Sequence, residues 1–129
     1  WASKLQTEIA LSTTEAEYIA LSTAAREVIP LVNLAKEATN RNIIPTANPP
    51  TIKCKMFEDN QGAVEMANVP KMRPRTKHLN IKYHFFRKYV EDGTLQVEHI
   101  PGEEQMAEVL TKPLEKALFQ KHRHAIAGW

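Results

Sequence analysis

Three segments of the chain alternate between apolar and polar residues, and this two-residue period predicts three short β-strands. The segments are residues 4–11, 51–58 and 94–100. In the second segment, Ile52 and Met56 share one side, whereas Lys53 and Lys55 share the other. Each predicted strand therefore has one face that can be buried.

Apolar residues spaced at about 3.6 positions predict five helices between and after these strands. The helices cover residues 14–38, 60–68, 78–92, 103–110 and 114–127. We expect a kink or a break near Pro30 in the first helix, because an interior proline removes a hydrogen bond. Residues 41–50, with three prolines, predict a linker, and residues 69–77 predict a basic loop. Strands separated by helical crossovers indicate an α/β domain with helices on the faces of a sheet.

The first predicted helix has two capping boxes and one apolar stripe. Ser12 with Glu15 and Thr14 with Glu17 both have the spacing in which a hydroxyl and a carboxylate satisfy the first free amides. The helical period assigns the buried face to Ala20, Ala24, Val28, Leu31, Leu34, Ala35 and Ala38.

In the third predicted helix, the same period separates an aromatic face from a basic face. The buried side would hold Leu79, Tyr83, Phe86 and Val90, and the outer side would hold His84, Arg87 and Lys88. Aromatic residues at this spacing are more typical of a core than of a surface that stacks nucleic-acid bases.

The length and composition are typical of one soluble domain or a piece of one, with 129 residues, 43% hydrophobic and 25% charged. No apolar run of about 18 residues and no leader segment occur, so we expect neither membrane insertion nor secretion. Cys54 has no partner for an internal disulfide, which fits a reducing, intracellular compartment. Because the chain begins at Trp1 in mid-pattern, we expect a fragment of a longer polypeptide.

Basic residues are concentrated in residues 71–90, where no Asp or Glu occurs although the net charge is only +2. This basic stripe consists of Lys71, Arg73, Arg75, Lys77, Lys82, Arg87 and Lys88. A local stripe on a nearly neutral chain favours a polyanion partner. A solvated charged face explains the pattern equally well.

Three acidic residues lie beside predicted strand ends: Glu17 after the first strand, Asp59 at the end of the second, and Glu108 after the third. Ligands of α/β sheets gather at the carboxyl ends of the strands, so these acids are candidates for one site. Converging carboxylates repel one another unless cations neutralise them, and oxygen ligands favour Mg²⁺ or Mn²⁺. The alternative is that Asp59 or Asn60 only caps the following helix.

Other common kinds of site are missing from the sequence. The five histidines and the single cysteine have no zinc-type spacing and fit surface or half-buried positions. No GxSxG, Walker or glycine-rich dinucleotide motif occurs. The sequence therefore gives no support to a zinc centre, a serine hydrolase or a nucleotide-binding loop.

Four motifs, in order along the chain, closely resemble the ribonuclease H domain at the end of copia-type retrotransposon Pol polyproteins. They are STTEAEYIAL (residues 12–21), FEDNQGAV (57–64), RPRTKHLNIKYHFFRKYV (73–90) and EEQMAEVLTKPL (103–114). The resemblance spans essentially the whole chain. It implies a ribonuclease H-like mixed sheet of five strands with flanking helices, of which the first two strands would be missing here.

The resemblance also implies a role for each acid. The family uses four acids, and Glu17, Asp59 and Glu108 would take three of these places; the choice of Glu17 over Glu15 rests on the resemblance. The fourth, an aspartate on the first strand, would lie before Trp1. Glu108 stands where the family usually has Asp, and its extra methylene displaces the carboxylate by about a bond length.

The family hydrolyses the RNA strand of RNA/DNA hybrids with two Mg²⁺ ions, for which Mn²⁺ can substitute. The implied partners are the hybrid and the upstream reverse transcriptase portion of the same polyprotein, in the cytoplasm, in virus-like particles or in the nucleus. Asn60 and Gln61 would contact the sugar-phosphate edge, and the basic stripe would neutralise the backbone.

Because one catalytic acid is missing, we expect the isolated chain to bind hybrid weakly and to cut little or none of it. Whether this chain is an enzyme by itself stays open. The alternatives are a non-catalytic remnant that binds nucleic acid and a structural module of the polyprotein.

Overall fold

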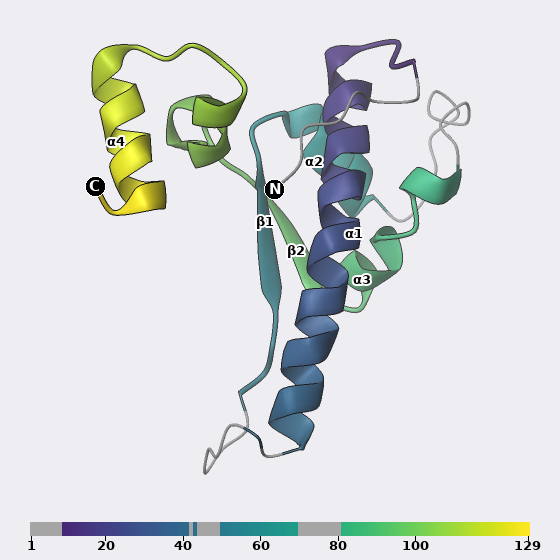
Figure 1. Ribbon diagram of the computed structural model, residues 1–129. Helices are drawn as coiled ribbons and strands as arrows, with labels where there is room; N and C mark the ends of the chain where they lie inside the picture. The colour runs from purple at the N-terminus through teal and green to yellow at the C-terminus, as the bar shows by residue number, and fades with distance from the viewer. Residues whose placement is uncertain (1–8, 42, 44–49, 70–80) are drawn as a thin grey trace.

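The computed structural model describes residues 9–41, 43, 50–69 and 81–129. Among these residues, β1 (Cys54–Glu58) and β2 (Leu95–His99) form a two-stranded parallel sheet (Figure 1). Cys54 pairs with Leu95 and Glu58 pairs with His99. The carboxyl ends of both strands therefore lie at the same edge of the sheet, where the sequence places Asp59.

Both strands lie within the predicted segments 51–58 and 94–100 and are shorter than these. Of the predicted strand at residues 4–11, only residues 9–11 are described, and these are not in a strand. Most of the predicted linker at residues 41–50 and of the basic loop at residues 69–77 lies outside the described residues. The described fold is thus a mixed α/β arrangement around a small parallel sheet.

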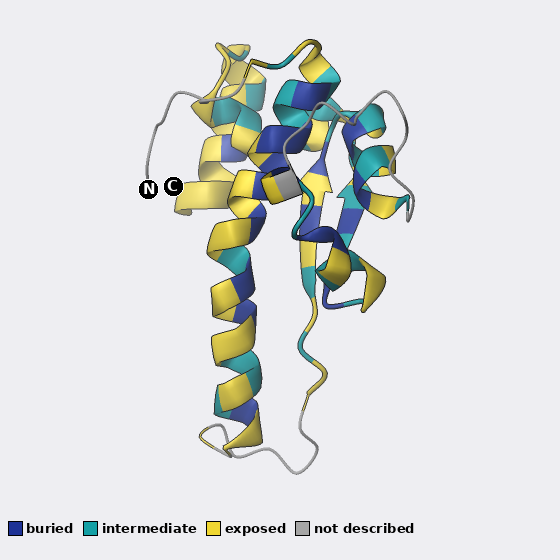
Figure 2. Cartoon of the chain, turned by 90° about the vertical axis from the view of Figure 1, so that its right-hand side faces the viewer, coloured by how far each residue is buried: buried dark blue, intermediate teal, exposed yellow. Residues whose placement is uncertain are grey.

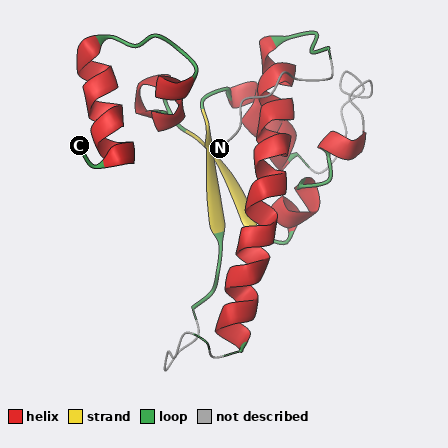
Figure 3. Ribbon diagram, viewed as in Figure 1, coloured by secondary structure: helices red, strands yellow, loops and turns green. Residues whose placement is uncertain are grey.

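The sheet lies between two groups of helices, as Figure 3 shows. On one side, α2 (Gln61–Asn68) packs on both strands, α3 (Arg87–Glu91) packs on β2, and α1 (Thr13–Asn40) packs on α2. On the other side lie η4 (Met106–Leu110) and α4 (Lys116–Ala127), which pack against each other. None of the described helices is long and apolar enough to cross a membrane.

The N-terminus of α1 is fixed by the first of the two predicted capping boxes. Oγ of Ser12 accepts a hydrogen bond from the backbone N–H of Glu15 at 3.2 Å, and Oε2 of Glu15 accepts one from the N–H of Leu11 at 2.7 Å. Because Glu15 serves the cap, Glu17 is not needed there. The helix runs without a break through Pro30, whose side chain is exposed, so the predicted break does not occur.

The buried face of α1 differs from the prediction. The helix buries Tyr18, Ile19, Leu21, Ser22, Ala25, Ile29 and Val32, whereas Leu31 and Leu34 are 64% and 63% exposed. Figure 2 shows buried and exposed stretches alternating along the helix. Ala20 and Ala24 are exposed as well. Apolar residues lie on two faces of this helix, and a period alone cannot tell which of them meets the sheet.

The predicted helix at residues 78–92 is not one helix in its described part. It consists of the 3₁₀ turn η2 (Ile81–Tyr83), a bend and the short α3. Nδ1 of His84 lies 2.8 Å from the hydroxyl of Tyr18, and the ring of Phe86 lies 5.6 Å from the same tyrosine. Residues two apart point about 200° away from each other on an α-helix, so both side chains can reach Tyr18 only if the helix is interrupted.

Within this segment, the predicted faces are partly right. Tyr83 and Phe86 are buried, Val90 packs against the core, and Lys88 is exposed. Leu79 lies outside the described residues. The outward position predicted for Arg87 is wrong, because this residue is only 8% exposed.

The predicted helix at residues 103–110 is replaced by two 3₁₀ helices, η3 (Gly102–Glu104) and η4. Gln105 separates them in an extended conformation, with φ of −72° and ψ of 97°. Its side-chain amide donates to the carbonyl of Phe57 at 3.0 Å, which ties this segment to β1. The last helix starts at Lys116, two residues after the predicted start, and ends where Gly128 adopts a φ of 76°.

Candidate functional site

The turn after β1 decides between the two roles predicted for Asp59 and Asn60. Oδ1 of Asn60 accepts a hydrogen bond from the N–H of Ala63 at 3.1 Å, so Asn60 is the N-cap of α2. The hydroxyl of Thr14 on α1 donates to the same oxygen at 3.3 Å. Asp59 does not cap the helix, and its side chain lines the cavity at the carboxyl end of β1.

Three carboxylates meet at this end of β1. Oxygen atoms of Glu17, Glu58 and Asp59 all lie within 4.8 Å of one another. Glu17 comes from the first turns of α1, whereas Glu58 and Asp59 come from the end of the strand. Two of the three predicted acids, far apart in the sequence, are therefore brought together by the packing of α1 over the sheet.

Glu58 is an acid of this cluster that was not predicted from the sequence. It is 6% exposed, and its Oε1 accepts a hydrogen bond from the N–H of Asn60 at 3.0 Å. The signal was present, because Glu58 lies on the same side of the strand as the buried Met56. A glutamate on a buried strand face is unusual and indicates a specific environment.

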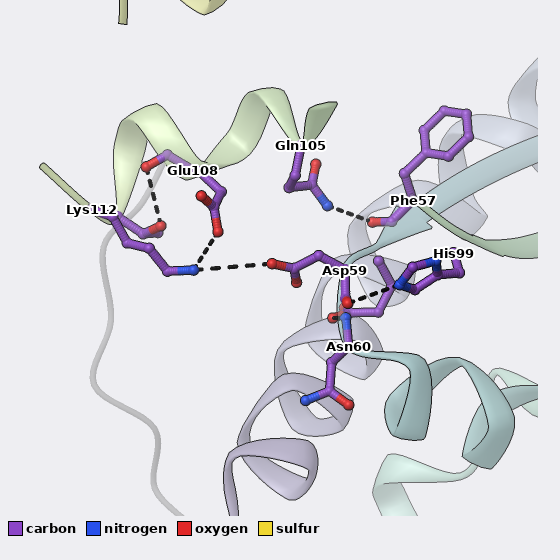
Figure 4. A network of polar contacts seen from close by, with 9 residues as sticks. Phe57, Asp59, Asn60, His99, Gln105, Glu108 and Lys112 are labelled. Carbon is purple, nitrogen blue, oxygen red and sulfur yellow. Dashed lines mark hydrogen bonds and ion pairs between the residues drawn. The ribbon is translucent and has the colours of Figure 1, made fainter. Parts of the chain in front are cut away.

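Glu108 reaches the same site from η4, as Figure 4 shows. The ammonium group of Lys112 contacts Oε1 of Glu108 and lies 4.0 Å from Oδ2 of Asp59. A Cβ atom on Gly102 would lie 3.6 Å from that Asp59 oxygen and 3.9 Å from the Glu108 oxygen. All three predicted acids thus border one site, with Lys112 between Asp59 and Glu108.

The electrostatics of the cluster are those of crowded negative charge. Burial raises the pKa of Glu17, and the charges of Asp59 and Glu108 raise it further, while Lys112 opposes them. Burial raises the pKa of Glu58 to about 7 against the hydrogen bond from Asn60, and the neighbouring Glu17 and Asp59 add to the shift. A cation bound among these acids would therefore stabilise the folded chain, because it reduces the repulsion between their carboxylates.

A cavity of about 420 Å³ opens over these residues. Its charged lining is made up of Glu17, Glu58, Asp59, Glu108 and Lys112. The exposed Ala20 and Ala24 of α1 form an apolar wall, and their small side chains leave the acids accessible. The acids lie at the carboxyl end of a parallel strand, the usual position of a ligand site in an α/β sheet.

The donor set fits a divalent metal ion. Every candidate ligand is a carboxylate oxygen, which suits Mg²⁺ or Mn²⁺ and does not suit zinc. The cluster combines a buried carboxylate with accessible ones, so an ion held here can also meet a ligand in the cavity. Glu17, Glu58 and Asp59 are the residues close enough together to hold one ion.

Only some of the residues predicted to contact nucleic acid are described in the structure. Gln61 is exposed at the first position of α2 and does not line the cavity, whereas the side chain of Asn60 is engaged in the cap. Lys88 is exposed, with its ammonium 4.9 Å from the ring centre of Tyr89. Lys71, Arg73, Arg75 and Lys77 lie outside the described residues.

The overall architecture is that of a mixed α/β protein with an acidic site. Comparison with known proteins identifies similar sequences in retrotransposon Pol polyproteins. The chain is 36% identical over 126 residues to the retrovirus-related Pol polyprotein from transposon RE2 of Arabidopsis thaliana. It is 38% identical over 120 residues to that of transposon RE1 of the same plant, and 35% identical over 120 residues to that of transposon TNT 1-94 of Nicotiana tabacum.

These matches cover 98%, 93% and 93% of this chain, respectively, but only 8% of each relative. The chain is thus homologous to one short segment of retrotransposon Pol polyproteins. No protein-family model and no solved structure matches it.

Proposed function

We propose that this chain is part of a copia-type retrotransposon ribonuclease H domain, which cleaves the RNA strand of RNA/DNA hybrids. The observation that supports this most is the convergence of carboxylates from α1, β1 and η4 on one cavity. The homologous segments in Pol polyproteins provide a context in which such hybrids arise. The domain would work next to the reverse transcriptase portion of the same polyprotein.

In this proposal, Glu17, Asp59 and Glu108 are the metal ligands, and two Mg²⁺ or Mn²⁺ ions are the cofactors. When bound, such ions would activate a water for attack on a phosphodiester and would stabilise the leaving oxygen. Glu58 would join Glu17 and Asp59 on one of the ions, since oxygen atoms of these three acids lie within 4.8 Å of one another, and it also holds the turn through Asn60. Gln61, which is exposed at the start of α2, would contact the sugar-phosphate edge of a bound strand.

The basic residues would bind phosphate groups of the nucleic acid at positions distant from the cleaved bond. Lys82 and Lys88 are exposed and suit this role, and Lys71, Arg73, Arg75 and Lys77 remain candidates. Arg87 is a weaker candidate, because its buried guanidinium is not free to approach a phosphate. Neutralisation of this kind gives an affinity that falls as salt rises.

The proposed ribonuclease H-like sheet needs strands besides β1 and β2. Among the described residues, β1 pairs only with β2, and no described strand lies along its other edge. A two-stranded sheet is marginal alone. We assign that edge to an upstream strand that carries the fourth acid and brings it beside Asp59.

One observation favours a non-catalytic alternative. Glu108 stands where the family usually has Asp, and its Oε1 is paired with Lys112. A remnant that binds nucleic acid without cutting it would tolerate this pair. Such a protein would bind hybrid equally well with Asp59 or with Asn at this position.

The test is a Mg²⁺-dependent cleavage assay on a labelled RNA/DNA hybrid. It compares this chain with a longer protein that also contains the preceding segment of its polyprotein. We expect strong cutting by the longer protein and little by the isolated chain. Equal, strong cutting by the isolated chain would show that three acids suffice, and binding without cutting by the longer protein would favour the non-catalytic alternative.

A further inference from the structure

Lys112 is a cation built into the acidic cavity. Its ammonium group contacts Oε1 of Glu108 and lies 4.0 Å from Oδ2 of Asp59. The lysine side chain is 57% exposed, whereas those of Asp59 and Glu108 are 25% and 14% exposed. Within the described ranges, no other lysine or arginine is paired with these two acids.

The local backbone fixes this position. The carbonyl of Glu108 accepts hydrogen bonds from the N–H groups of Thr111 at 3.0 Å and of Lys112 at 2.9 Å. These bonds close a turn at the end of η4 and bring the lysine back over the glutamate four positions earlier. Pro113 follows and restricts the backbone of Lys112 to a few conformations.

The charges around the site are unequal on its two sides. Glu17, Glu58 and Asp59 share the side formed by α1 and β1, where oxygen atoms lie within 4.8 Å of one another. Lys112 stands on the other side, between Asp59 and Glu108. The first side therefore holds an excess of negative charge, and the other already holds a positive charge.

We propose that Lys112 is an internal counter-ion that takes the position of a divalent cation between Asp59 and Glu108, and that an ion binding there must displace it. The proposal rests on the proposed metal-dependent function. An ammonium group and a metal ion need the same two carboxylate oxygens, so they compete for them. Without metal, the lysine reduces the repulsion between the acids and keeps Glu108 over the cavity.

This competition predicts one strong and one weak ion site. The side lined by Glu17, Glu58 and Asp59 binds its ion without displacing Lys112 from Glu108. The side with Glu108 binds a second ion only after Lys112 has left. Removing the lysine charge therefore strengthens the weaker site and changes the stronger one little.

The test is calorimetric titration of the whole chain with Mn²⁺ alone. We compare the native chain with Lys112→Met, which removes the charge, and with Lys112→Arg, which keeps it. Lys53→Met is the matched control, because Lys53 is exposed at the opposite end of β1. We expect Lys112→Met to raise the weaker Mn²⁺ affinity about five- to tenfold, as expected for loss of a nearby unit charge, and the other two variants to change it less than about twofold.

Two results would count against these ideas in different ways. If Lys112→Met binds Mn²⁺ no more tightly than the native chain, the counter-ion proposal is overturned while the metal site stands. If Asp59→Asn binds Mn²⁺ as well as the native chain does, the metal site itself fails. Lys112→Met should also melt at a lower temperature without metal and gain more from added Mn²⁺, and a thermal shift equal to that of the native chain contradicts the proposal.

Discussion

Oδ1 of Asn60 accepts a hydrogen bond from the backbone N–H of Ala63 at 3.1 Å, so Asn60 and not Asp59 caps α2. Because Asn60 caps α2, the neighbouring Asp59 can face Lys112 and the other acids. A single turn of the chain thus supplies both the start of a helix and a carboxylate at the end of a parallel strand.

This cap predicts the effect of Asn60→Ala. The substitution removes the acceptor for Ala63 and the contact with Thr14, so we expect the free energy of unfolding to fall by about 1–2 kcal/mol. Urea denaturation measures it. The matched control is Gln61→Ala at the exposed next position, for which we expect a change within about 0.5 kcal/mol. Equal losses in both variants would show that Asn60 is not a cap.

Glu58 predicts a pH-dependent stability. Its pKa rises from 4.5 to about 7 on folding, chiefly because of burial. Between these two pKa values, the folded chain keeps a proton that the unfolded chain has released. This contribution therefore lowers stability as pH rises from about 4.5 to 7.

Glu58→Gln removes that titration and keeps an acceptor for the N–H of Asn60. We expect the variant to gain stability relative to the native chain between pH 5 and pH 8, in urea denaturation with a chelator present. Glu91→Gln, at an exposed position on α3, serves as the control and should show a constant difference. A pH-independent difference for Glu58→Gln would contradict the position assigned to this carboxylate.

Divalent ions should stabilise the chain through Asp59. If Mn²⁺ binds the folded chain and not the unfolded chain, it raises the melting temperature. At a Mn²⁺ concentration well above the dissociation constant, we expect a rise of about 3–8 °C. Asp59→Asn should abolish this rise, whereas Glu91→Gln should keep it. Persistence of the full rise in Asp59→Asn would place the ion elsewhere.

Pro30 offers a stabilising substitution away from the acids. It is exposed inside α1, and its ring removes one helical hydrogen bond to the carbonyl of Arg26. We expect Pro30→Ala to raise the free energy of unfolding by about 2 kcal/mol, after allowance for the more flexible unfolded chain. The exposed neighbour provides the comparison, since Leu31→Ala should change stability by less than about 0.5 kcal/mol. No gain from Pro30→Ala would mean that α1 accommodates the proline without cost.

The sequence predicted those parts of the fold that depend on local chemistry. The strand that ends at Glu58, the helix that follows Asn60 and the capping box of Ser12 with Glu15 are all fixed by neighbouring residues. The position of Asp59 at the carboxyl end of a strand follows from these elements. The convergence of Glu17 and Glu108 on this point was expected partly from the resemblance to a known family.

Features that depend on tertiary contacts could not be predicted in this way. The interruption before α3 exists because His84 and Phe86 both turn toward Tyr18. The choice of the buried face of α1 depends on where the sheet lies, since Leu31 and Leu34 have the same period as the core residues. The place of Lys112 between two acids depends on a turn at the end of η4.

The measurement that tests the central claim most directly is cleavage of a labelled RNA/DNA hybrid with Mg²⁺ by the longer Pol segment that includes this chain. Native protein, Asp59→Asn and Glu91→Gln are compared at equal concentration. We expect the native protein and Glu91→Gln to cut only the RNA strand, and Asp59→Asn to cut at least a hundredfold more slowly while still binding the hybrid. Undiminished cutting by Asp59→Asn would contradict the claim that carboxylates at the end of β1 hold the catalytic ions.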